Sequence, residues 1–187
     1  MTAHEREGII DTQSQQAWWA LAFQQRATTQ GLEILRQRLG QKIIRIFQPM
    51  RLLLEYHRGA FQLRRRPLYP GYAFIQCAPT VLRHVIDNRP DSMYGPVRLG
   101  ESLIPVQSHE MDLLQALTGN TGTAGLSHGE LQGDRVHIIS GPLQGKEGMI
   151  LKFSKRKHRA TICVSLDNKR IRLDLACITR PRITHDH

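Results

Sequence analysis

The chain has 187 residues, enough for one medium domain or two small ones, and 40% of them are hydrophobic, enough to bury a core. Its 26 Lys and Arg against 16 Asp and Glu give a formal net charge of +10, which favours a polyanionic partner. No apolar run approaches the ~20 residues that span a bilayer, and residues 1–8 do not resemble a signal peptide. We therefore expect a cytoplasmic protein with no membrane segment.

The first part of the chain alternates strand and helix patterns. Short apolar or alternating runs predict strands, which we place at residues 18–23, 43–47, 50–56, 61–65 and 72–77, with a turn at 57–60. Helices are expected after Thr28 or Thr29, after Thr80 and over residues 108–117, because a hydroxyl residue suited to an N-cap precedes apolar residues at helical spacing. These patterns predict an α+β domain over residues 17–118, after a flexible segment at 1–16.

Composition changes at residues 119–133, which read GNTGTAGLSHGELQG, with five glycines and no Lys or Arg. We interpret residues 119–132 as a flexible linker. Beyond it the pattern is all strand, and we expect strands at 136–139, 148–153, 160–166 and 169–175. Asp167-Asn168 is a two-residue hairpin signal. Strands this short predict a small closed barrel over residues 133–182, followed by a tail at 183–187.

Positive charge is concentrated in this second part. From Asp134 onward there are twelve basic and five acidic residues. The densest stretch is 152–159, which reads KFSKRKHR and holds five formal positive charges in eight residues. Lys169, Arg170 and Arg172 follow on the adjoining hairpin, where they would extend one basic face. This pattern favours a bound phosphate backbone. The alternative is a solvated charge run that keeps a small barrel soluble.

Catalytic and metal-binding patterns do not stand out. Cys77, Cys163 and Cys177 lack disulfide or zinc spacing, and we interpret them as reduced residues of a core. His109 begins a stretch like a zinc-protease helix, but no second histidine follows four residues later. There is no glycine-rich phosphate loop and no evident pair of catalytic carboxylates. We expect a protein that is not an enzyme and uses no metal or cofactor.

Four segments, in order, resemble the NusG family. Residues 66–75 (RPLYPGYAFI) resemble the F-P-G-Y-V-F-V strand of that family's N-terminal domain, and residues 133–136 with 140–148 resemble the opening of a KOW motif. The run WWAL at 18–21 lies where the family has its aromatic first strand, and LIPV at 103–106 resembles its P-I-P run before the last helix. The resemblance covers about residues 17–180. It implies an N-terminal domain of the NusG type joined by a linker to a small all-β KOW barrel.

The resemblance implies a transcription elongation factor whose N-terminal domain binds RNA polymerase and suppresses pausing. In that family the docking surface is aromatic, which suits a protein interface because rings supply large contact area at low entropy cost. Carried over, it names Tyr69, Tyr72 and Phe74, with Trp19 beside them. Ordinary core packing is the alternative for these aromatic residues. Arg83 and His84 occupy the place where the relative RfaH contacts polymerase, and a solvated helix face is the alternative there.

The barrel of general NusG proteins recruits ribosomal protein S10 or the termination factor Rho through an apolar loop, in which Leu143 replaces an aromatic residue here. The R-K-x-R-A pattern at 156–160 instead resembles the specialised paralogue LoaP, a processive antiterminator whose barrel reads an RNA hairpin. The RNA contacts that this implies are Lys152, Lys155, Arg156, Lys157, His158, Arg159, Lys169, Arg170 and Arg172.

The leading hypothesis is therefore an antitermination factor that docks on polymerase and binds a nascent RNA hairpin. The first alternative is a general NusG-like or RfaH-like elongation factor whose barrel recruits a protein, and the second is a ribosome-associated RNA-binding protein. Arg64, Arg65 and Arg66 form a further basic run, which would face upstream or non-template DNA, an acidic polymerase surface, or only solvent.

Overall fold

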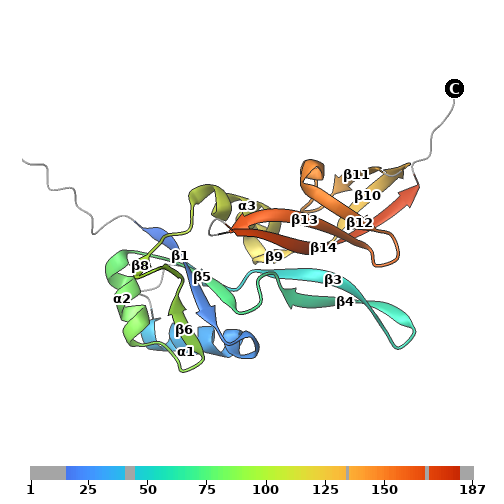
Figure 1. Cartoon of the computed structure of the whole chain (residues 1–187). Coiled ribbons are helices and arrows are strands. Elements are labelled where there is room, and N and C mark those ends of the chain that lie inside the picture. Colours follow the sequence, from blue (N-terminus) through green and yellow to red (C-terminus); the bar gives the residue numbers. More distant parts are fainter. Residues whose placement is uncertain (1–15, 41–44, 134, 167–168, 182–187) are drawn as a thin grey trace, which may run out of the picture.

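The computed structural model describes residues 16–40, 45–133, 135–166 and 169–181. An N-terminal part of strands and helices lies beside a C-terminal part built of strands (Figure 1). Our predictions for residues 1–15, 43–44 and 183–187, and for the Asp167-Asn168 turn, lie outside the described residues.

The N-terminal sheet has four antiparallel strands in the order β2-β5-β1-β6, which are β1 (Ala17–Phe23), β2 (Arg45–Phe47), β5 (Tyr72–Cys77) and β6 (Met93–Pro96). In the register of β1 with β5, Trp19 lies opposite Ile75 and Ala20 opposite Phe74. Because side chains alternate along a strand, each pair projects from a different face of the sheet. Strands β1 and β5 were predicted from the sequence, whereas β6 was not.

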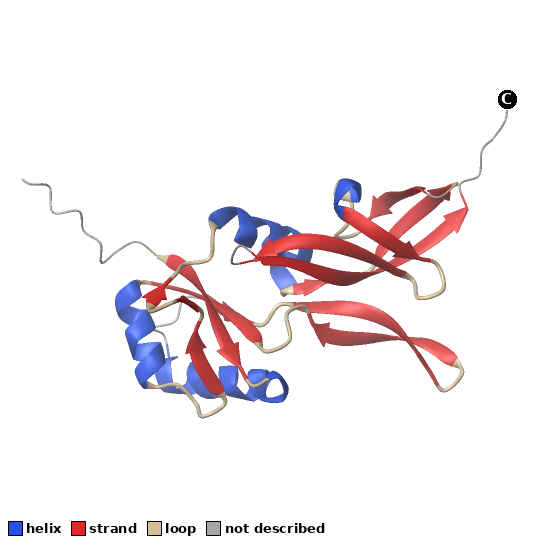
Figure 2. Cartoon of the chain, in the orientation of Figure 1, coloured by secondary structure: helices blue, strands red, loops and turns tan. Residues whose placement is uncertain are grey.

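Two helices cover one face of this sheet, which we call the helix-side face. They are α1 (Thr28–Leu39) and α2 (Pro79–Asp87), and a third helix, α3 (Ser108–Thr118), lies on the other side (Figure 2). All three were expected, but none of their N-caps makes a side-chain hydrogen bond. Helix α2 instead starts at Pro79, whose fixed φ suits the first helical turn. None of the described helices has the length and apolarity that crossing a membrane requires.

A long hairpin leaves the N-terminal sheet and runs alongside the C-terminal part (Figure 1). It consists of β3 (Met50–His57) and β4 (Ala60–Pro67). Arg58 and Gly59 at its tip have φ of 48° and 84°, the left-handed values that a two-residue hairpin turn requires. The predicted turn at residues 57–60 is confirmed. A smaller hairpin pairs β7 (Arg98–Leu99) with β8 (Ser102–Leu103).

The C-terminal part, which we call the barrel, is a five-stranded sheet in the order β11-β10-β14-β13-β12. Its strands are β10 (Ser127–Gln132), β11 (Arg135–Ser140), β12 (Ile150–Ser154), β13 (Arg159–Leu166) and β14 (Lys169–Pro181). It was expected to close, but among the described residues β11 and β12 do not pair. The turn η4 (Glu147–Met149) lies between them, and the Glu147 carboxylate accepts a hydrogen bond from the Ile138 amide at 3.1 Å.

The linker prediction for residues 119–132 is wrong. These residues form the turn η3 (Gly119–Thr121), the short strand β9 (Thr123–Ala124), which pairs in parallel with β3, and β10. Because β10 lies between β11 and β14, the barrel begins at Ser127 rather than at residue 133. A Cβ atom on Gly129 would lie 2.9 Å from the His137 carbonyl oxygen, so this glycine serves close packing rather than flexibility.

Candidate functional site

The second face of the N-terminal sheet is covered by the barrel and α3, and we call it the barrel-side face. Phe74 and Ala20 of the sheet are buried there in one continuous core with Met111 and Leu114 of α3. The same core continues through the barrel interior, where its members include Ile138, Leu143, Ile162, Leu173 and Leu175. Tyr69 and Phe74, our predicted polymerase contacts, are buried in this shared core with exposures of 6% and 0%.

Aromatic rings line the barrel-side face. The Phe74 ring centroid lies 6.2 Å from that of Phe47 and 6.0 Å from that of Tyr69, and Trp18 lies 5.8 Å from Phe47. The Arg45 guanidinium lies 5.6 Å from the Trp18 ring centroid, within cation–π range. Sequence reasoning missed Trp18 and Phe47. The alternation along β1, which places Trp18 and Ala20 on one face, was the signal that could have found Trp18.

Three of the predicted polymerase contacts lie away from this face. Trp19 is 6% exposed in the helix-side core, where its indole N–H donates to the Cys77 carbonyl at 3.1 Å. The expectation that Trp19 lies beside Tyr72 and Phe74 is therefore wrong, because strand alternation turns it to the opposite face of the sheet. Arg83 and His84 are exposed on α2, which also packs on the helix-side face, so they are not brought together with Tyr69 and Phe74.

A small cavity of about 120 Å³ lies where the barrel meets the N-terminal part. Tyr69, Tyr72 and Glu110 line it from one side, and Leu166, Lys169 and Ile171 from the barrel. Burial, together with the nearby charge of Glu110, raises the pKa of Tyr69 to about 12, so its phenol is neutral at physiological pH. Tyr72 remains 39% exposed at the edge of this contact.

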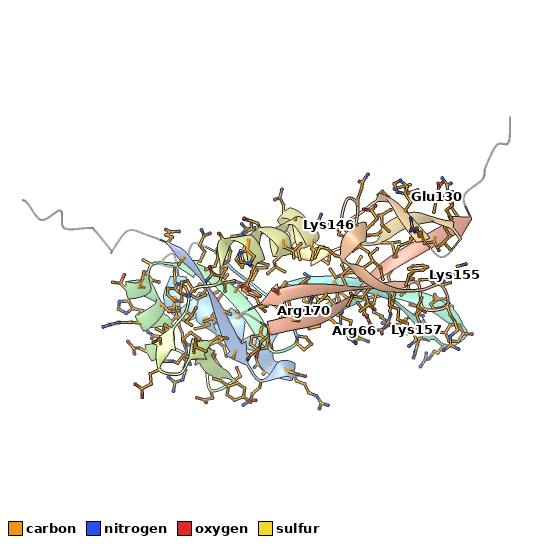
Figure 3. The ribbon with its side chains drawn as sticks, turned by 45° about the horizontal axis from the view of Figure 1, so that its top comes forward. Arg66, Glu130, Lys146, Lys155, Lys157 and Arg170 are labelled. Carbon is orange, nitrogen blue, oxygen red and sulfur yellow. The ribbon has the colours of Figure 1, made fainter. Side chains whose placement is uncertain are left out.

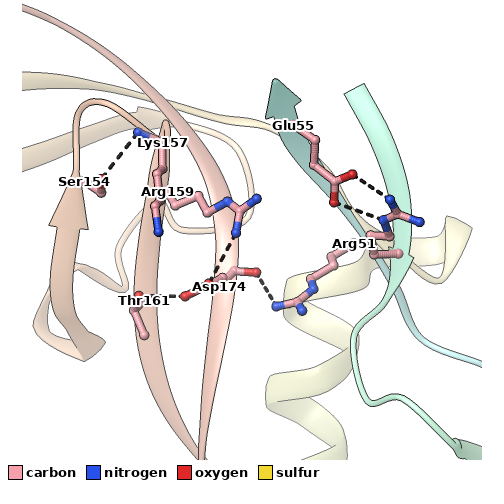
Figure 4. Close-up of polar contacts among 8 residues, drawn as sticks. Arg51, Glu55, Ser154, Lys157, Arg159, Thr161 and Asp174 are labelled. Atoms are coloured by element: carbon pink, nitrogen blue, oxygen red, sulfur yellow. Dashed lines mark hydrogen bonds and ion pairs between the residues drawn. The ribbon is translucent and has the colours of Figure 1, made fainter. Parts of the chain in front are cut away.

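Polar contacts also cross between the two parts (Figure 4). Arg51 of β3 donates to the Asp174 carbonyl oxygen of β14 at 2.7 Å. Burial lowers the pKa of Arg51, and the Asp174 charge opposes that shift. The Asp174 carboxylate accepts a hydrogen bond from Thr161 at 2.7 Å and lies 3.6 Å from the Arg159 guanidinium. Arg159, a predicted RNA contact, is therefore partly committed to an ion pair within the barrel.

The turn between β12 and β13, residues 155–158, carries three exposed cations, and we call it the basic loop. Its backbone is fixed locally, because the Lys157 amide donates to Ser154 Oγ at 3.3 Å and the His158 amide to the Lys155 carbonyl at 3.2 Å. Lys155, Arg156 and Lys157 are exposed, and none has a carboxylate partner within ion-pair distance in the described chain. Lys152 is exposed on β12 and lines the same groove as Arg156 and Lys157.

The second predicted basic cluster lies elsewhere. Lys169 pairs with Leu166 at one end of the β13–β14 hairpin, whereas Arg159, which follows the basic loop, pairs with Ala176 at the other. The strand between these ends spans about 23 Å at 3.3 Å per residue. Figure 3 shows Arg170 well away from Lys155 and Lys157. The expectation of one continuous basic face formed by the loop with Lys169, Arg170 and Arg172 is therefore wrong, because β13 separates them.

The structure also shows the surroundings of Leu143 and of the three cysteines. Leu143, which by the resemblance replaces an aromatic residue of an apolar loop, is fully buried in the barrel core. All three cysteines are free, and burial raises the pKa of both Cys77 and Cys177 to about 11. Within the described ranges, no three His, Cys, Asp or Glu side chains are grouped so as to hold a metal ion.

Comparison with known proteins places this fold. A family model described as "Transcription termination factor nusG" matches residues 16–115, more than half of the chain. The chain belongs to the NusG family. A curated relative, the "Transcription termination/antitermination protein NusG" of Thermus thermophilus, is 22% identical over 147 residues, which are 73% of this chain and 79% of that protein.

A solved structure described as "Domain interaction in Thermotoga maritima NusG" resembles most of the fold. It has a TM-score of 0.53 at 19% identity and covers 87% of this chain and 94% of its own. The family model ends at residue 115, whereas this structure covers enough of the chain to include most of the barrel. Membership of the NusG family, predicted from four sequence segments, is confirmed, and with it a place among transcription termination and antitermination factors.

Proposed function

We propose that this chain is a specialised cytoplasmic antitermination factor of the NusG family. Its N-terminal sheet docks on RNA polymerase and suppresses pausing and termination, and its barrel binds a structured nascent RNA, such as a hairpin. The chemistry is binding alone, without catalysis or a cofactor.

The observation that carries the RNA assignment is the basic loop. Lys155, Arg156 and Lys157 stand exposed and without acidic partners on one rigid turn of the barrel. If these cations served only to stabilise the fold, we would expect them to be paired with carboxylates or spread over the surface, because three neighbouring positive charges repel one another. Lys and Arg at this spacing suit a phosphate backbone, since each contact releases condensed counterions from the RNA.

Polymerase docking is assigned to the barrel-side face, where Trp18, Phe47, Tyr69 and Phe74 form an aromatic surface. Because Tyr69 and Phe74 are buried in the core that the barrel shares, docking through them requires the two parts to separate. Tyr72, already 39% exposed at the edge, is the residue available for first contact.

The alternative function is recruitment of ribosomal protein S10 or Rho by the barrel. It receives less support, because Leu143, at the position of the family's apolar contact, is fully buried here.

The test is binding of the full chain to a random pool of RNA hairpins at two salt concentrations, with duplex DNA as competitor. Lys155→Ala/Arg156→Ala/Lys157→Ala is expected to abolish selection and to reduce the slope of log K against log salt by about 2–3, because each phosphate contact contributes roughly 0.7–0.9. Lys169→Ala/Arg170→Ala/Arg172→Ala removes equal charge from the far end of the barrel and is the matched control.

Each result decides between assignments. If the control triple variant loses binding and the loop variant keeps it, the RNA site lies at the other end of β13. Binding that ignores RNA structure and disappears at the higher salt would contradict the RNA function. Stable capture of ribosomal protein S10 would then favour the alternative. Polymerase docking is checked separately by co-purification with Tyr72→Ala, which is expected to weaken the complex.

A further inference from the structure

The basic loop does not stand alone, because the tip of the β3–β4 hairpin lies against it. The Phe61 and His158 ring centroids are 4.9 Å apart in an edge-to-face arrangement, and Phe61 in turn contacts Tyr56 at 5.4 Å. Three rings therefore run from the barrel onto the N-terminal hairpin. Tyr56 and Phe61 are cross-strand partners near the tip, and they remain 68% and 44% exposed.

Beside this ring contact, a groove lies between the hairpin and the loop. It has a volume of about 570 Å³, and its walls are Leu54, Glu55, Tyr56 and Phe61 on one side and Arg156, Lys157 and Arg159 on the other. A second groove of about 440 Å³ shares the same three cations and extends towards Lys152. One wall is thus largely apolar and aromatic, and the opposite wall is cationic.

The electrostatic balance of the first groove is positive. Its one carboxylate among the described residues, Glu55, accepts two hydrogen bonds from Arg66, at 3.0 and 2.6 Å, and these bonds hold its pKa below the usual range. Glu55 is therefore already neutralised by Arg66. Arg64 and Arg65 are exposed further along β4 and have no ion pair in the described chain.

We infer that the β3–β4 hairpin and the basic loop form one composite RNA site, in which the cations hold the backbone of a stem and Tyr56 and Phe61 stack on unpaired bases beside it. This inference rests on the RNA-binding function proposed above and adds to it the class of RNA. Unpaired bases in loops and bulges are the parts of RNA that proteins read by aromatic stacking. An exposed aromatic pair facing a cationic wall supplies both interactions, ring stacking on the bases and charge pairing with the phosphates.

A purely structural role is the competing explanation, because an aromatic cross-strand pair also stabilises a hairpin. The variant Tyr56→Leu/Phe61→Leu separates the two, since leucine preserves apolar packing but removes the ring face. Tyr56→Phe keeps the ring and is expected to bind as the native chain does. Tyr94→Leu, which replaces a tyrosine that is 70% exposed on β6, is the matched control for loss of an exposed ring.

The experiment measures binding of the full chain to a hairpin RNA with an unpaired uridine loop and to a blunt RNA duplex of the same length. Tyr56→Leu/Phe61→Leu is expected to weaken hairpin binding roughly tenfold or more, to leave duplex binding unchanged, and to leave the salt slope unchanged. With 5-bromouridine in the RNA loop, photo-crosslinks are expected at Tyr56 or Phe61.

Failure of this inference is distinguishable from failure of the proposed function. If the leucine variant binds the hairpin normally while the basic-loop triple variant does not, the composite site is overturned and the RNA function stands. If the native chain prefers neither RNA over duplex DNA, both are overturned. Crosslinks confined to the barrel would also overturn the composite site.

Discussion

Ile171 packs the barrel onto the N-terminal sheet, and Ile171→Asp is expected to separate the two parts. The side chain is half-buried on β14 and lines the cavity shared with Tyr69 and Tyr72. In an open arrangement that cavity no longer exists, and the side chain of residue 171 loses the walls that Tyr69 and Tyr72 form. A charge at this position therefore destabilises the closed arrangement and has little effect on the open one.

The magnitude follows from burial. Complete burial of an isoleucine contributes about 1.5–3 kcal/mol, so the half-buried Ile171 contributes about 1 kcal/mol. A carboxylate placed against apolar walls adds a desolvation cost of at least about 2 kcal/mol. An ion pair between the new carboxylate and Lys169 would offset little of this cost, because the Lys169 side chain is exposed. The total of about 3 kcal/mol lowers the ratio of closed to open molecules by more than about 100-fold.

Small-angle X-ray scattering measures the separation directly as an increase in the radius of gyration. A hydrophobic dye is expected to bind the uncovered Tyr69 and Phe74, and circular dichroism shows whether the barrel remains folded. Leu151→Asp, at a position 58% exposed on β12, is the matched control and is expected to change neither readout. Unchanged scattering from a folded Ile171→Asp protein would refute the reasoning.

Three further predictions concern stability and pH. Gly129→Ala is expected to lower barrel stability by about 1–3 kcal/mol in thermal unfolding, because its Cβ would lie 2.9 Å from the His137 carbonyl oxygen, whereas Gly125→Ala, with no atom within 4 Å, is expected to be near neutral. Backbone hydrogen bonds, first from its own amide and then from Ile138 and Gly145, hold the pKa of the Glu147 carboxyl below 4.5. The stability that this carboxylate contributes to the folded chain is therefore complete above pH 4.5 and is lost as the pH falls below it. In urea unfolding, the free energy of unfolding of Glu147→Gln should fall less at acidic pH than that of the native chain. Because the pKa of Tyr69 is raised to about 12, the contact between the barrel and the N-terminal part is most stable below pH 10.0 and weakens as the pH rises towards about 12. Over this range, the radius of gyration of Tyr69→Phe should therefore increase less than that of the native chain.

The sequence was sufficient for features set by local pattern. The strands at residues 18–23 and 72–77 and the helix over residues 108–117 were predicted from the spacing of apolar residues, and the structure contains them as β1, β5 and α3. The turn predicted at residues 57–60 follows from Gly59, because glycine adopts left-handed φ without a steric cost. These signals act within a few residues, so no tertiary information was needed.

Features that depend on tertiary contacts were not predictable in the same way. Trp18 and Trp19 are adjacent aromatic residues that alternation assigns to opposite faces, and which of those faces the barrel meets depends on tertiary contacts. The glycine-rich residues 119–132 have the composition of a linker, yet Gly129 is needed for a close approach of β10 to β11. Two basic clusters close in sequence lie apart because an eight-residue strand runs between them.

The two proposed interfaces are coupled through the same closed arrangement. The composite site needs the β3–β4 hairpin against the basic loop, whereas docking needs Tyr69 and Phe74 uncovered. By linkage, RNA that stacks on Tyr56 and Phe61 opposes docking, and docking weakens RNA binding by the same factor. The basic loop belongs to the barrel alone, so its phosphate contacts persist after opening. Polymerase is therefore expected to weaken hairpin binding by the roughly tenfold that the ring faces contribute, and this antagonism should vanish in Tyr56→Leu/Phe61→Leu. Antagonism that persists in that variant would show that the coupling does not pass through the hairpin.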